Sequence, residues 1–426
     1  MEFSKYKLKD LTVNGKGEYG IGASAVEYSP DLYKYLRITD IDDDGFINSN
    51  HMKSINDTNE ERYLLKTNDI VFARTGNSTG KSYFYSSDDG PLVYAGFLIK
   101  FSLDPTKLNP RYLRYYTLTN EYKGWVHQFS IGSTRKNINA KIFGDMEIGL
   151  PPRYYQDFVV DILDSLENKV KINKQIIANL EELSQTLFKR WFVDFEFPDK
   201  DGNPYKSSGG EMIDSELGKI PSNWKIYKLK DIASHKKETF NPKKSEEVTV
   251  KHFSLPAYDN EEQAIEEEVN KIKSNKWIIN NNCVLFSKMN PDTKRIWLPV
   301  IDNKKLNVAS SEFVVMESPN NKINSFIYNI CLNSQFVDYL KANTTGSTNS
   351  RQRVKPTIAV NYKLAIEDSI VKKYSEIITP YMEEMKILRS EIGKLTQLRD
   401  TLLPKLMSGE LEISDDIEVN SDELSI

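Results

Sequence analysis

The chain is short of the residues that metal and disulfide sites need. It has 426 residues but only two cysteines, Cys283 and Cys331, and four histidines. Two cysteines exclude a disulfide framework and a four-thiolate zinc site, and the histidines show no paired spacing of the kind that metal enzymes use. We therefore expect no metal site in this chain.

Long apolar runs are also missing. No stretch approaches the roughly 18 uncharged apolar residues of a membrane span. The start, MEFSKYKLKD, has no apolar core of the kind a signal peptide needs. Hydrophobic residues still make up 39% and aromatic residues 11%, which favours packed cores over disorder. We expect a cytoplasmic protein with two or more domains, because one core seldom serves more than about 250 residues.

The net charge of −4 is unevenly distributed along the chain. Residues 1–150 are neutral and residues 221–367 carry a net charge of +6. The acidity is concentrated in 196–220 (net −3) and 414–426 (net −5). The larger segments are therefore neutral to basic, which permits binding to nucleic acid.

The strongest pattern in the chain is a repetition of its first half by its second half. Four segments recur in the same order at nearly one offset: YKLKD at 6–10 and 227–231, YLLKTNDIVFAR at 63–74 and WIINNNCVLFSK at 277–288, Gly-Ser-Thr at 132–134 and 346–348, and LSQTLFKRW at 183–191 and LRDTLLPKL at 398–406. The offset is far longer than the period of a solenoid repeat, so it indicates duplication of a whole domain with its helix.

Each half begins with a mixed region and closes with a long helix. Runs such as IVFAR, LVYAGFLIKF and SEFVVME, separated by turn residues, predict short strands. Asn109 and Pro110 predict a helix start, with a capping asparagine before a proline. The apolar stripes of the two long helices are expected at Phe158, Ile162, Leu166, Val170, Ile176, Leu180, Leu183 and Leu187, and at Val371, Tyr374, Ile378, Tyr381, Met385, Leu388, Ile392, Leu395, Leu402 and Leu406.

The two stripes are expected to bury each other over roughly 50 Å of helix. Arg399 interrupts the second stripe, and Pro380 marks either the start of that helix or a kink in it. The predicted fold is α+β, with two mixed α/β domains separated by two long antiparallel helices and related by a pseudo-twofold repeat. The expected segments are 1–150 (first domain), 151–195 (central spacer helix), 196–220 (linker), 221–367 (second domain), 368–413 (C-terminal spacer helix) and 414–426 (acidic disordered tail).

Two glycine-rich segments are similar to cofactor motifs but lack their context. Gly15–Gly20 matches a dinucleotide fingerprint, yet Pro30 ends any helix that could present its N-terminus to a pyrophosphate. Gly76–Ser82 is one residue short of a phosphate loop, and Tyr83-Phe84-Tyr85 predicts a strand where the required helix should begin. The alternatives for this basic loop are contact with nucleic acid and a solvated hairpin.

Two further patterns suggest enzymes and also lack support. Asn109-Pro110-Arg111-Tyr112 is similar to the Asn-Pro-Pro-Tyr motif of DNA adenine methyltransferases, but Arg111 replaces a proline and no S-adenosylmethionine loop accompanies it. Asp292 and Asp302-Asn303-Lys304 match a loose nuclease pattern that has no counterpart in the first half. We therefore expect no catalytic residues and no bound cofactor in this chain.

The chain resembles the DNA-specificity subunits of type I restriction–modification systems. The segments that carry the resemblance, which spans residues 1–413, are YKYLRITDID (33–42), NDIVFARTGNSTGKS (68–82), the two Gly-Ser-Thr motifs, LEELSQTLFKRWFVDF (180–195), GKIPSNW (218–224) and LRDTLLPKLMSGEL (398–411). The resemblance implies two target recognition domains held apart by two antiparallel helices. It also implies a non-catalytic subunit that docks with two modification (methyltransferase) subunits and then with restriction translocase subunits.

On this interpretation the chain reads double-stranded DNA, while S-adenosylmethionine, ATP and Mg²⁺ belong to partner subunits. Two similar domains on a rigid spacer suit a bipartite target, and the different loops at 73–82 and 287–297 predict different half-sites. The candidate DNA contacts are Arg74, Thr75, Lys81, Arg135, Lys136, Lys288, Lys294, Arg295, Arg351 and Arg353. The candidate docking residues are Leu187, Phe188, Trp191, Leu406 and Leu411.

Three functional hypotheses follow from the sequence. The first is a DNA-specificity subunit, the second a coiled-coil scaffold that does not read DNA, and the third a self-contained nuclease or methyltransferase. For each basic candidate the alternative to a DNA contact is an ordinary solvated charge. Binding of DNA together with modification subunits separates the first hypothesis from the second.

Overall fold

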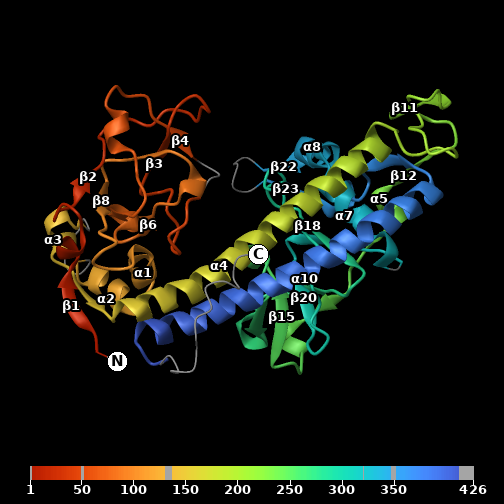
Figure 1. Ribbon diagram of the computed structural model, residues 1–426. Coiled ribbons are helices and arrows are strands. Elements are labelled where there is room, and N and C mark those ends of the chain that lie inside the picture. The colour runs from red at the N-terminus through yellow and green to blue at the C-terminus, as the bar shows by residue number, and fades with distance from the viewer. Residues whose placement is uncertain (1, 49–51, 130–136, 320, 347–351, 412–426) are drawn as a thin grey trace. The chain divides into compact units, whose positions relative to one another are not determined.

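The computed structural model describes residues 2–48, 52–129, 137–319, 321–346 and 352–411 (Figure 1). The chain forms two compact units: unit 1 comprises residues 1–168 and 396–426, and unit 2 comprises residues 169–395. The division passes through both long helices. Each unit therefore combines one mixed domain with part of each helix, whereas the sequence prediction treated the helices as separate segments.

The domain of unit 1 begins and ends on one antiparallel strand pair, β1 (Ser4–Lys7) and β9 (Glu147–Leu150). Between them lie a four-stranded antiparallel sheet of order β2-β8-β5-β6 and a three-stranded sheet of order β4-β3-β7, in which β3 and β7 are parallel. The strands of these sheets are β2 (Glu18–Tyr19), β3 (Lys34–Leu36), β4 (Lys53–Ser54), β5 (Asp69–Ala73), β6 (Ser82–Phe84), β7 (Leu92–Tyr94) and β8 (Leu98–Ser102).

β5 is an inner strand of its sheet, and all five of its side chains are buried. Burial on both faces explains why its sequence is a continuous apolar run without alternation. The helices of the domain are α1 (Pro110–Tyr116), α2 (Asn120–Gln128) and α3 (Ala140–Gly144). The predicted cap of α1 is confirmed, because the Asn109 side chain accepts a hydrogen bond from the Arg111 N–H (3.0 Å) and Pro110 is the first helical residue.

Unit 2 repeats this plan. β12 (Lys225–Lys228) pairs with β24 (Lys363–Ile366), a four-stranded sheet has the order β13-β21-β18-β19, and a five-stranded sheet has the order β14-β17-β20-β15-β16 with β15 and β20 parallel. The strands of these two larger sheets are β13 (Ser234–His235), β14 (Thr239–Phe240), β15 (Thr249–Phe253), β16 (Ile265–Glu268), β17 (Lys276–Ile278), β18 (Cys283–Ser287), β19 (Ile296–Trp297), β20 (Asn307–Ala309) and β21 (Phe313–Glu317). A further pair, β22 (Thr344–Thr345) and β23 (Arg353–Val354), is antiparallel. Its helices include α5 (Leu229–Ile232), α6 (Leu255–Asp259), α7 (Asn324–Leu332), α8 (Ser334–Ala342) and α9 (Pro356–Ala359).

The strand orders confirm the internal repeat. β2, β8, β5 and β6 in unit 1 correspond in sheet position to β13, β21, β18 and β19 in unit 2, and the parallel pair β3–β7 corresponds to β15–β20. Unit 2 adds β14 and β17 to the edge of its second sheet. The equivalent positions of the two domains can therefore be compared directly.

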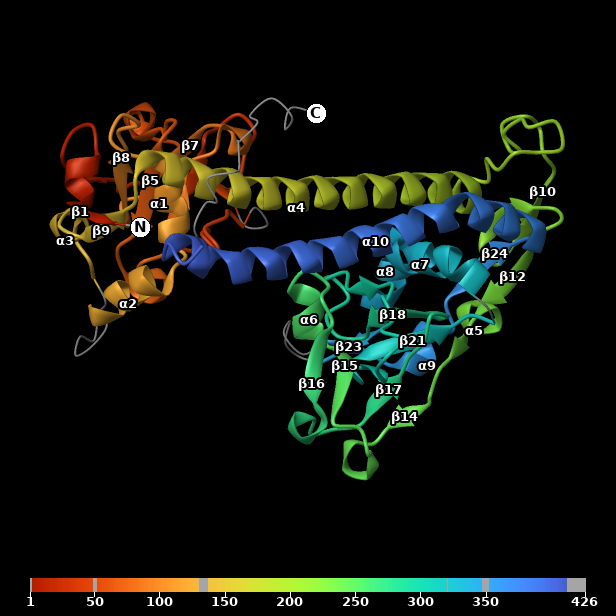
Figure 2. The same ribbon diagram turned by 60° about the horizontal axis from the view of Figure 1, so that its bottom comes forward.

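The two long helices are α4 (Arg153–Phe188), which continues into a π-helical turn at Lys189–Val193, and α10 (Asp368–Met407). α10 runs through Pro380, so this proline does not mark its start. Within unit 2 the two helices are antiparallel: the Tyr374 hydroxyl donates to the Ser184 carbonyl (3.0 Å), and the Asn173 amide donates to Glu391 (2.8 Å). α7 lies along α10 (Figure 2), where Phe326 packs against Tyr374.

The buried face of α4 in unit 2 differs from the predicted stripe. Leu183 is 56% exposed and Ile176 is also exposed, while Asn173 and Ser184 are fully buried. Polar side chains can take these seam positions because they find partners there: Asn173 meets Glu391, and the Ser184 hydroxyl donates to Asn329 (3.0 Å). The predicted stripe counted only apolar residues and so misplaced the seam.

Each long helix ends inside the domain of the other half. In unit 1 the C-terminal end of α10 contributes Leu406 and Met407 to the core around Tyr155, whose hydroxyl donates to the Leu406 carbonyl (3.0 Å). In unit 2 the end of α4 contributes Phe188 and the turn after it contributes Trp191, both packed against Tyr374 near the start of α10. Each domain core therefore requires residues from both halves of the sequence.

The segment expected as a linker, 196–220, is folded onto unit 2. β10 (Met212–Ser215) and β11 (Gly218–Pro221) form an antiparallel hairpin. Phe197 is buried and stacks on Trp224, with ring centroids 5.0 Å apart, and on Tyr205 at 4.7 Å. The tail expected at 414–426 lies outside the described residues. Across the part of the chain that is described, no helix has the length and apolar character needed to cross a membrane.

Candidate nucleic-acid interface

The first candidate loop joins β5 to β6 in unit 1. It contains Gly76 and Gly80, both with positive φ, and Tyr122 of α2 donates a hydrogen bond to the Gly80 carbonyl (2.6 Å). A Cβ at position 80 would overlap the side chain of Val126, so glycine is required by space as well as by conformation. The loop leads directly into the strand β6, which confirms that Gly76–Ser82 does not have the strand–loop–helix form of a phosphate loop.

Arg74 is held at the end of β5 by its own backbone. Its N–H donates to the Phe97 carbonyl (3.0 Å), and its carbonyl accepts from the Ile138 N–H (2.9 Å). Its guanidinium lies 5.0 Å from the ring centroid of Tyr19, and its Nε donates to the Asn137 side chain (3.3 Å). The side chain is thus partly exposed on a fixed backbone, with donors left for a ligand.

The second candidate loop, between β18 and β19, is held in the same way in unit 2. The Lys288 N–H donates to the Glu312 carbonyl (3.0 Å), and the Lys288 carbonyl accepts from the Val354 N–H (2.9 Å). Thr75 forms a bridge with Asn137 in unit 1, and Met289 forms one with Arg353 in unit 2. Arg74 and Lys288 therefore occupy equivalent sites, as the sequence alignment predicted.

Most of the other described basic candidates already have partners within their own unit. The Lys288 ammonium donates to the Ser311 carbonyl (2.7 Å), and Arg353 pairs with Glu312 (3.1 Å). Lys81 pairs with Asp43 (2.9 Å), and Arg295 makes two hydrogen bonds to Asp259. Lys294 is exposed. Arg135, Lys136 and Arg351 lie outside the described residues.

The exposed residues beside Arg74 were missed in the sequence. Phe97, whose carbonyl holds the Arg74 N–H, is 59% exposed, and Tyr19 is exposed as well. Asn137 was also missed, although it directly follows the candidate Lys136. The available signal was the Ala95-Gly96-Phe97 interruption in LVYAGFLIKF, which structurally is the turn between β7 and β8.

The predicted docking residues are largely inside the molecule, which corrects the prediction. Phe188 and Trp191 are buried in the core of unit 2, and Leu406 is buried in that of unit 1. Leu187 and Leu411 are half-buried and pack against the same two cores. The helix-end motifs recur because each completes a domain core, so the buried members cannot anchor a partner in this conformation.

Asp292 and the two cysteines lie in settings that do not favour catalysis. Asp292 of the loose nuclease pattern pairs with Lys341 (2.6 Å). Both cysteines are buried, and desolvation raises the pKa of the Cys283 thiol to about 11, which disfavours the reactive thiolate. Among the described residues no cluster of three or more histidine, cysteine, aspartate or glutamate side chains could hold a metal ion.

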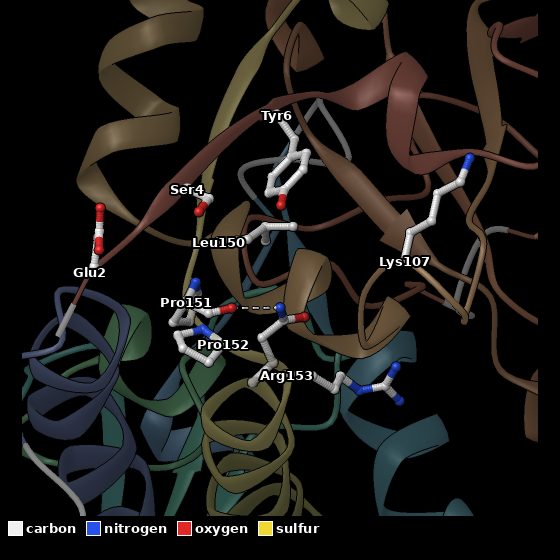
Figure 3. Close-up of a pocket in the computed structure, with 9 residues that line it drawn as sticks. Glu2, Ser4, Tyr6, Lys107, Leu150, Pro151, Pro152 and Arg153 are labelled. Atoms are coloured by element: carbon white, nitrogen blue, oxygen red, sulfur yellow. Dashed lines mark hydrogen bonds between the residues drawn. The ribbon is translucent and has the colours of Figure 1, made fainter.

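A hollow of about 300 Å³ lies in unit 1 where β9 meets α4 (Figure 3). Its lining includes Tyr6, Lys107, Arg153 and Gln156. Arg153 is engaged with Asp157 (2.8 Å) and the Pro105 carbonyl (2.7 Å), and the Gln156 amide donates to the Pro151 carbonyl (2.8 Å). These hydrogen bonds stabilise the junction between strand and helix.

The chain is similar in sequence to the DNA-specificity subunits of type I restriction enzymes. The model of a family described as the type I restriction modification DNA specificity domain matches residues 2–182. The type I restriction enzyme MjaIX specificity subunit of Methanocaldococcus jannaschii is 26% identical over 312 residues, which cover 71% of this chain and 69% of that protein. The HindI specificity subunit of Haemophilus influenzae is 26% identical over 142 residues, or 32% of this chain and 30% of that protein.

A solved structure is similar over nearly the whole chain. It is the crystal structure of a type I restriction–modification S subunit from M. genitalium, with a TM-score of 0.53 and 14% identity over 97% of each chain. At this identity the likeness concerns the fold. It agrees with two repeated α/β domains and two long helices in one chain.

Proposed function

Because the chain belongs to the DNA-specificity subunits of type I restriction–modification systems, we propose that it reads an asymmetric, bipartite DNA target and assembles the other subunits on it. Each of its two domains would read one half-site. The proposed place of action is the cytoplasm. The alternatives from the sequence, a scaffold that does not read DNA and a self-contained enzyme, lack an observation in their favour.

The observation that supports DNA reading most directly is the pair of equivalent strand ends. Arg74 and Lys288 each follow the inner strand of a four-stranded sheet, and each is fixed by backbone hydrogen bonds on both sides. A fixed backbone positions a long basic side chain for guanine O6 and N7 or for phosphate oxygens. Sites that are equivalent in backbone but different in residue suit two different half-sites.

The differences between the two loops support an asymmetric target. The unit 1 loop has two glycines and exposed aromatic neighbours, Tyr19 and Phe97. The unit 2 loop has no glycine, and Glu312 occupies the position of Phe97, because its carbonyl accepts from the Lys288 N–H as the Phe97 carbonyl does from Arg74. Different side chains in equivalent loops present different donors and apolar groups to the bases.

Chemistry on the DNA is assigned to partners in this proposal. Two modification subunits would supply methyl transfer with S-adenosylmethionine, and restriction translocase subunits would supply ATP- and Mg²⁺-dependent cleavage. The pseudo-repeat supports two similar docking sites for modification subunits. The docking surfaces would be formed by exposed residues near the helix ends, since Phe188, Trp191 and Leu406 serve the domain cores.

Methylome sequencing of a host that carries this chain with its modification subunits tests the proposal. The expected result is one bipartite methylated motif with an unread gap. Exchanging residues 73–82 for the corresponding loop of another specificity subunit should change one half-site and preserve the other. Absence of any motif would exclude DNA reading, and methylation by the chain alone with S-adenosylmethionine would favour a self-contained enzyme.

A further inference from the structure

In each unit one loop contacts both a long helix and the candidate DNA-binding loop, which is the β5–β6 loop in unit 1 and the β18–β19 loop in unit 2. We call these two candidate loops the reading loops. In unit 1 the contacting loop leads from β3 to β4, and in unit 2 it leads from β15 to β16, which are the corresponding strand pairs of the two repeats. We name residues 37–48 and 254–264 of these connections the bracing loops; the second includes the short helix α6. Each bracing loop carries one acidic side chain that contacts a basic residue of the reading loop and another that contacts an arginine of α10.

The first set of contacts joins the bracing loop to the reading loop. Lys81 and Arg295 are equivalent, because each directly precedes the edge strand of its sheet, β6 or β19. The Lys81 ammonium lies 2.9 Å from the Asp43 carboxylate. The Nε and Nη2 groups of Arg295 donate to both carboxylate oxygens of Asp259, at 2.6 and 2.9 Å. The same position therefore meets a bracing-loop carboxylate in both repeats.

The second set of contacts joins the bracing loop to α10. In unit 1 the Asp44 carboxylate lies 3.8 Å from the Arg399 guanidinium. In unit 2 the Glu262 carboxylate lies 3.0 Å from Nε of Arg389, and Arg389 is buried. Arg399, which interrupts the apolar stripe in the sequence, thus contacts a loop of the domain.

The bracing loop of unit 2 contacts the long helices at several points besides the Glu262–Arg389 ion pair. Glu261 and Glu262 have φ values of 62° and 54°, a left-handed conformation that side-chain-bearing residues seldom adopt. The Gln263 amide donates to the Arg389 carbonyl (3.0 Å), and a Cβ on Gly393 would overlap the Gln263 side chain. Glu261 also pairs with Lys174 of α4 at 2.9 Å. Contacts with both helices thus hold this backbone in an unfavourable conformation.

We propose that Lys81 and Arg295 are positioning residues that fasten the reading loops to the long helices through the bracing loops. The inference rests on the proposed DNA reading and refines it. It reassigns two residues that the sequence had indicated as DNA contacts. Their role is to fix where the preceding loop, with Arg74 or Lys288 at its start, presents its side chains.

The geometry of Arg295 argues against a direct DNA contact. Its side chain is only 14% exposed, and both ends of the Asp259 carboxylate are engaged by it. Turning the guanidinium towards a base would leave the Asp259 charge unpaired beside DNA phosphates, which is unfavourable. In unit 1 the Asp43 side chain is 91% exposed, so the Lys81 pair should contribute less than the pair in unit 2.

A double-mutant cycle on Arg295 and Asp259 tests this role in the assembly with modification subunits. Binding to the target duplex is measured over a range of salt for R295A, D259A and the double variant. If the pair positions the loop, each single variant should weaken binding by about tenfold and the double variant should be no weaker than either. The slope of log K against log salt should stay at its wild-type value, because no phosphate contact is lost.

Lys294→Ala is the matched control, since it removes one positive charge from the same loop and leaves the Arg295–Asp259 ion pair intact. Its effect should add to that of D259A. A direct DNA contact by Arg295 predicts the opposite pattern: D259A would leave binding unchanged or tighten it, and R295A would make the salt slope shallower by about 0.9. That result would overturn the inference while leaving the proposed function intact.

Two further measurements keep the inference testable if the alanine variants fold poorly or the wild type binds no DNA. D259N and R295K preserve shape, and the charge-exchanged pair R295D/D259R should recover part of the binding lost in R295D. The same cycle in thermal unfolding of the free chain should also be non-additive. Additive effects on unfolding would exclude the brace whether or not the chain reads DNA, and a wild type without DNA binding would exclude only the proposed function.

Discussion

Arg74 differs from three of the other described basic candidates in its partners. Lys81, Arg295 and Arg353 pair with carboxylates, whereas the interactions of Arg74 described above are with the ring of Tyr19 and the amide of Asn137. Neutral partners leave its charge available to DNA, and the aromatic face limits the rotamers it can adopt. Among the described residues of unit 1, we therefore propose Arg74 as the side chain that reads a base.

Replacing Arg74 with alanine should relax the preference at one base pair of one half-site, by about 1–3 kcal/mol, because a bidentate contact with guanine would be lost. Motif profiling of the assembled complex measures this. Lys16→Ala, which removes an exposed charge in the same unit, should leave the motif unchanged. An unchanged motif at full affinity in R74A would show that Arg74 is only a solvated charge.

Glu262 should make the stability of unit 2 depend on pH. Burial raises the pKa of its carboxyl to about 7, although Arg389 acts in the opposite direction. The folded state then holds a proton that the unfolded chain releases above its ordinary pKa of about 4.5. Stability should therefore fall as pH rises between these two values and level off above pH 7. Thermal unfolding of wild type and E262Q from pH 5 to 7.5 measures this, and parallel pH curves for the two proteins would contradict it.

At the scale of secondary structure, the end of α4 acts as part of a domain core. Phe188 contacts Phe192, Phe326 and Tyr374. Phe188→Ala should lower the free energy of unfolding by roughly 3–5 kcal/mol, because it leaves a cavity in a packed core. Leu183→Ala on the exposed face of the same helix is the control and should change stability by less than about 0.5 kcal/mol.

Denaturant unfolding of the two variants compares these effects. If F188A were as stable as the wild type while losing a modification subunit, Phe188 would be a docking residue after all. If L183A were the less stable variant, the assignment of the buried face of α4 would be wrong.

The sequence predicted elements well where local chemistry dominates. The buried strand at 69–73, the Asn109 cap and the repeat itself depend on short patterns or on matches between segments. The seam of α4 was misplaced because Asn173 and Ser184 are buried by virtue of partners more than 140 residues away in the sequence. The partners of Lys81 and Arg295 are Asp43 and Asp259, which lie 38 and 36 residues away in the sequence. They could not be predicted either, since only the folded chain brings them together.

At the scale of the whole molecule, the division of the chain through both helices changes how the spacer should be engineered. Each domain is built on segments of α4 and α10, so lengthening one helix alone would shift one set of core residues against the other. Seven residues inserted in both helices, near 168 and near 395, should lengthen the spacer by about 10 Å. The unread gap should then grow by about three base pairs, at about 3.4 Å each.

Methylome sequencing of this paired insertion variant reports the gap directly, and both half-site sequences should persist. Insertion in α4 alone is the control and should destabilise the chain. An unchanged gap in a folded paired variant would contradict the role of the helices as a spacer.

The order of synthesis gives the shared cores a further consequence. Residues 1–168 leave the ribosome first, but the core around Tyr155 needs Leu406 and Met407, which emerge only after all of unit 2 has been made. Unit 2, whose core combines Phe188 with Tyr374, has its whole sequence available earlier. The first domain to be translated is therefore the last to be completed, and a chain that stops near residue 395 presents a finished second domain beside a first domain with an exposed apolar face. Such a fragment should be cleared by chaperones and proteases faster than the full chain, because its exposed apolar face cannot be covered.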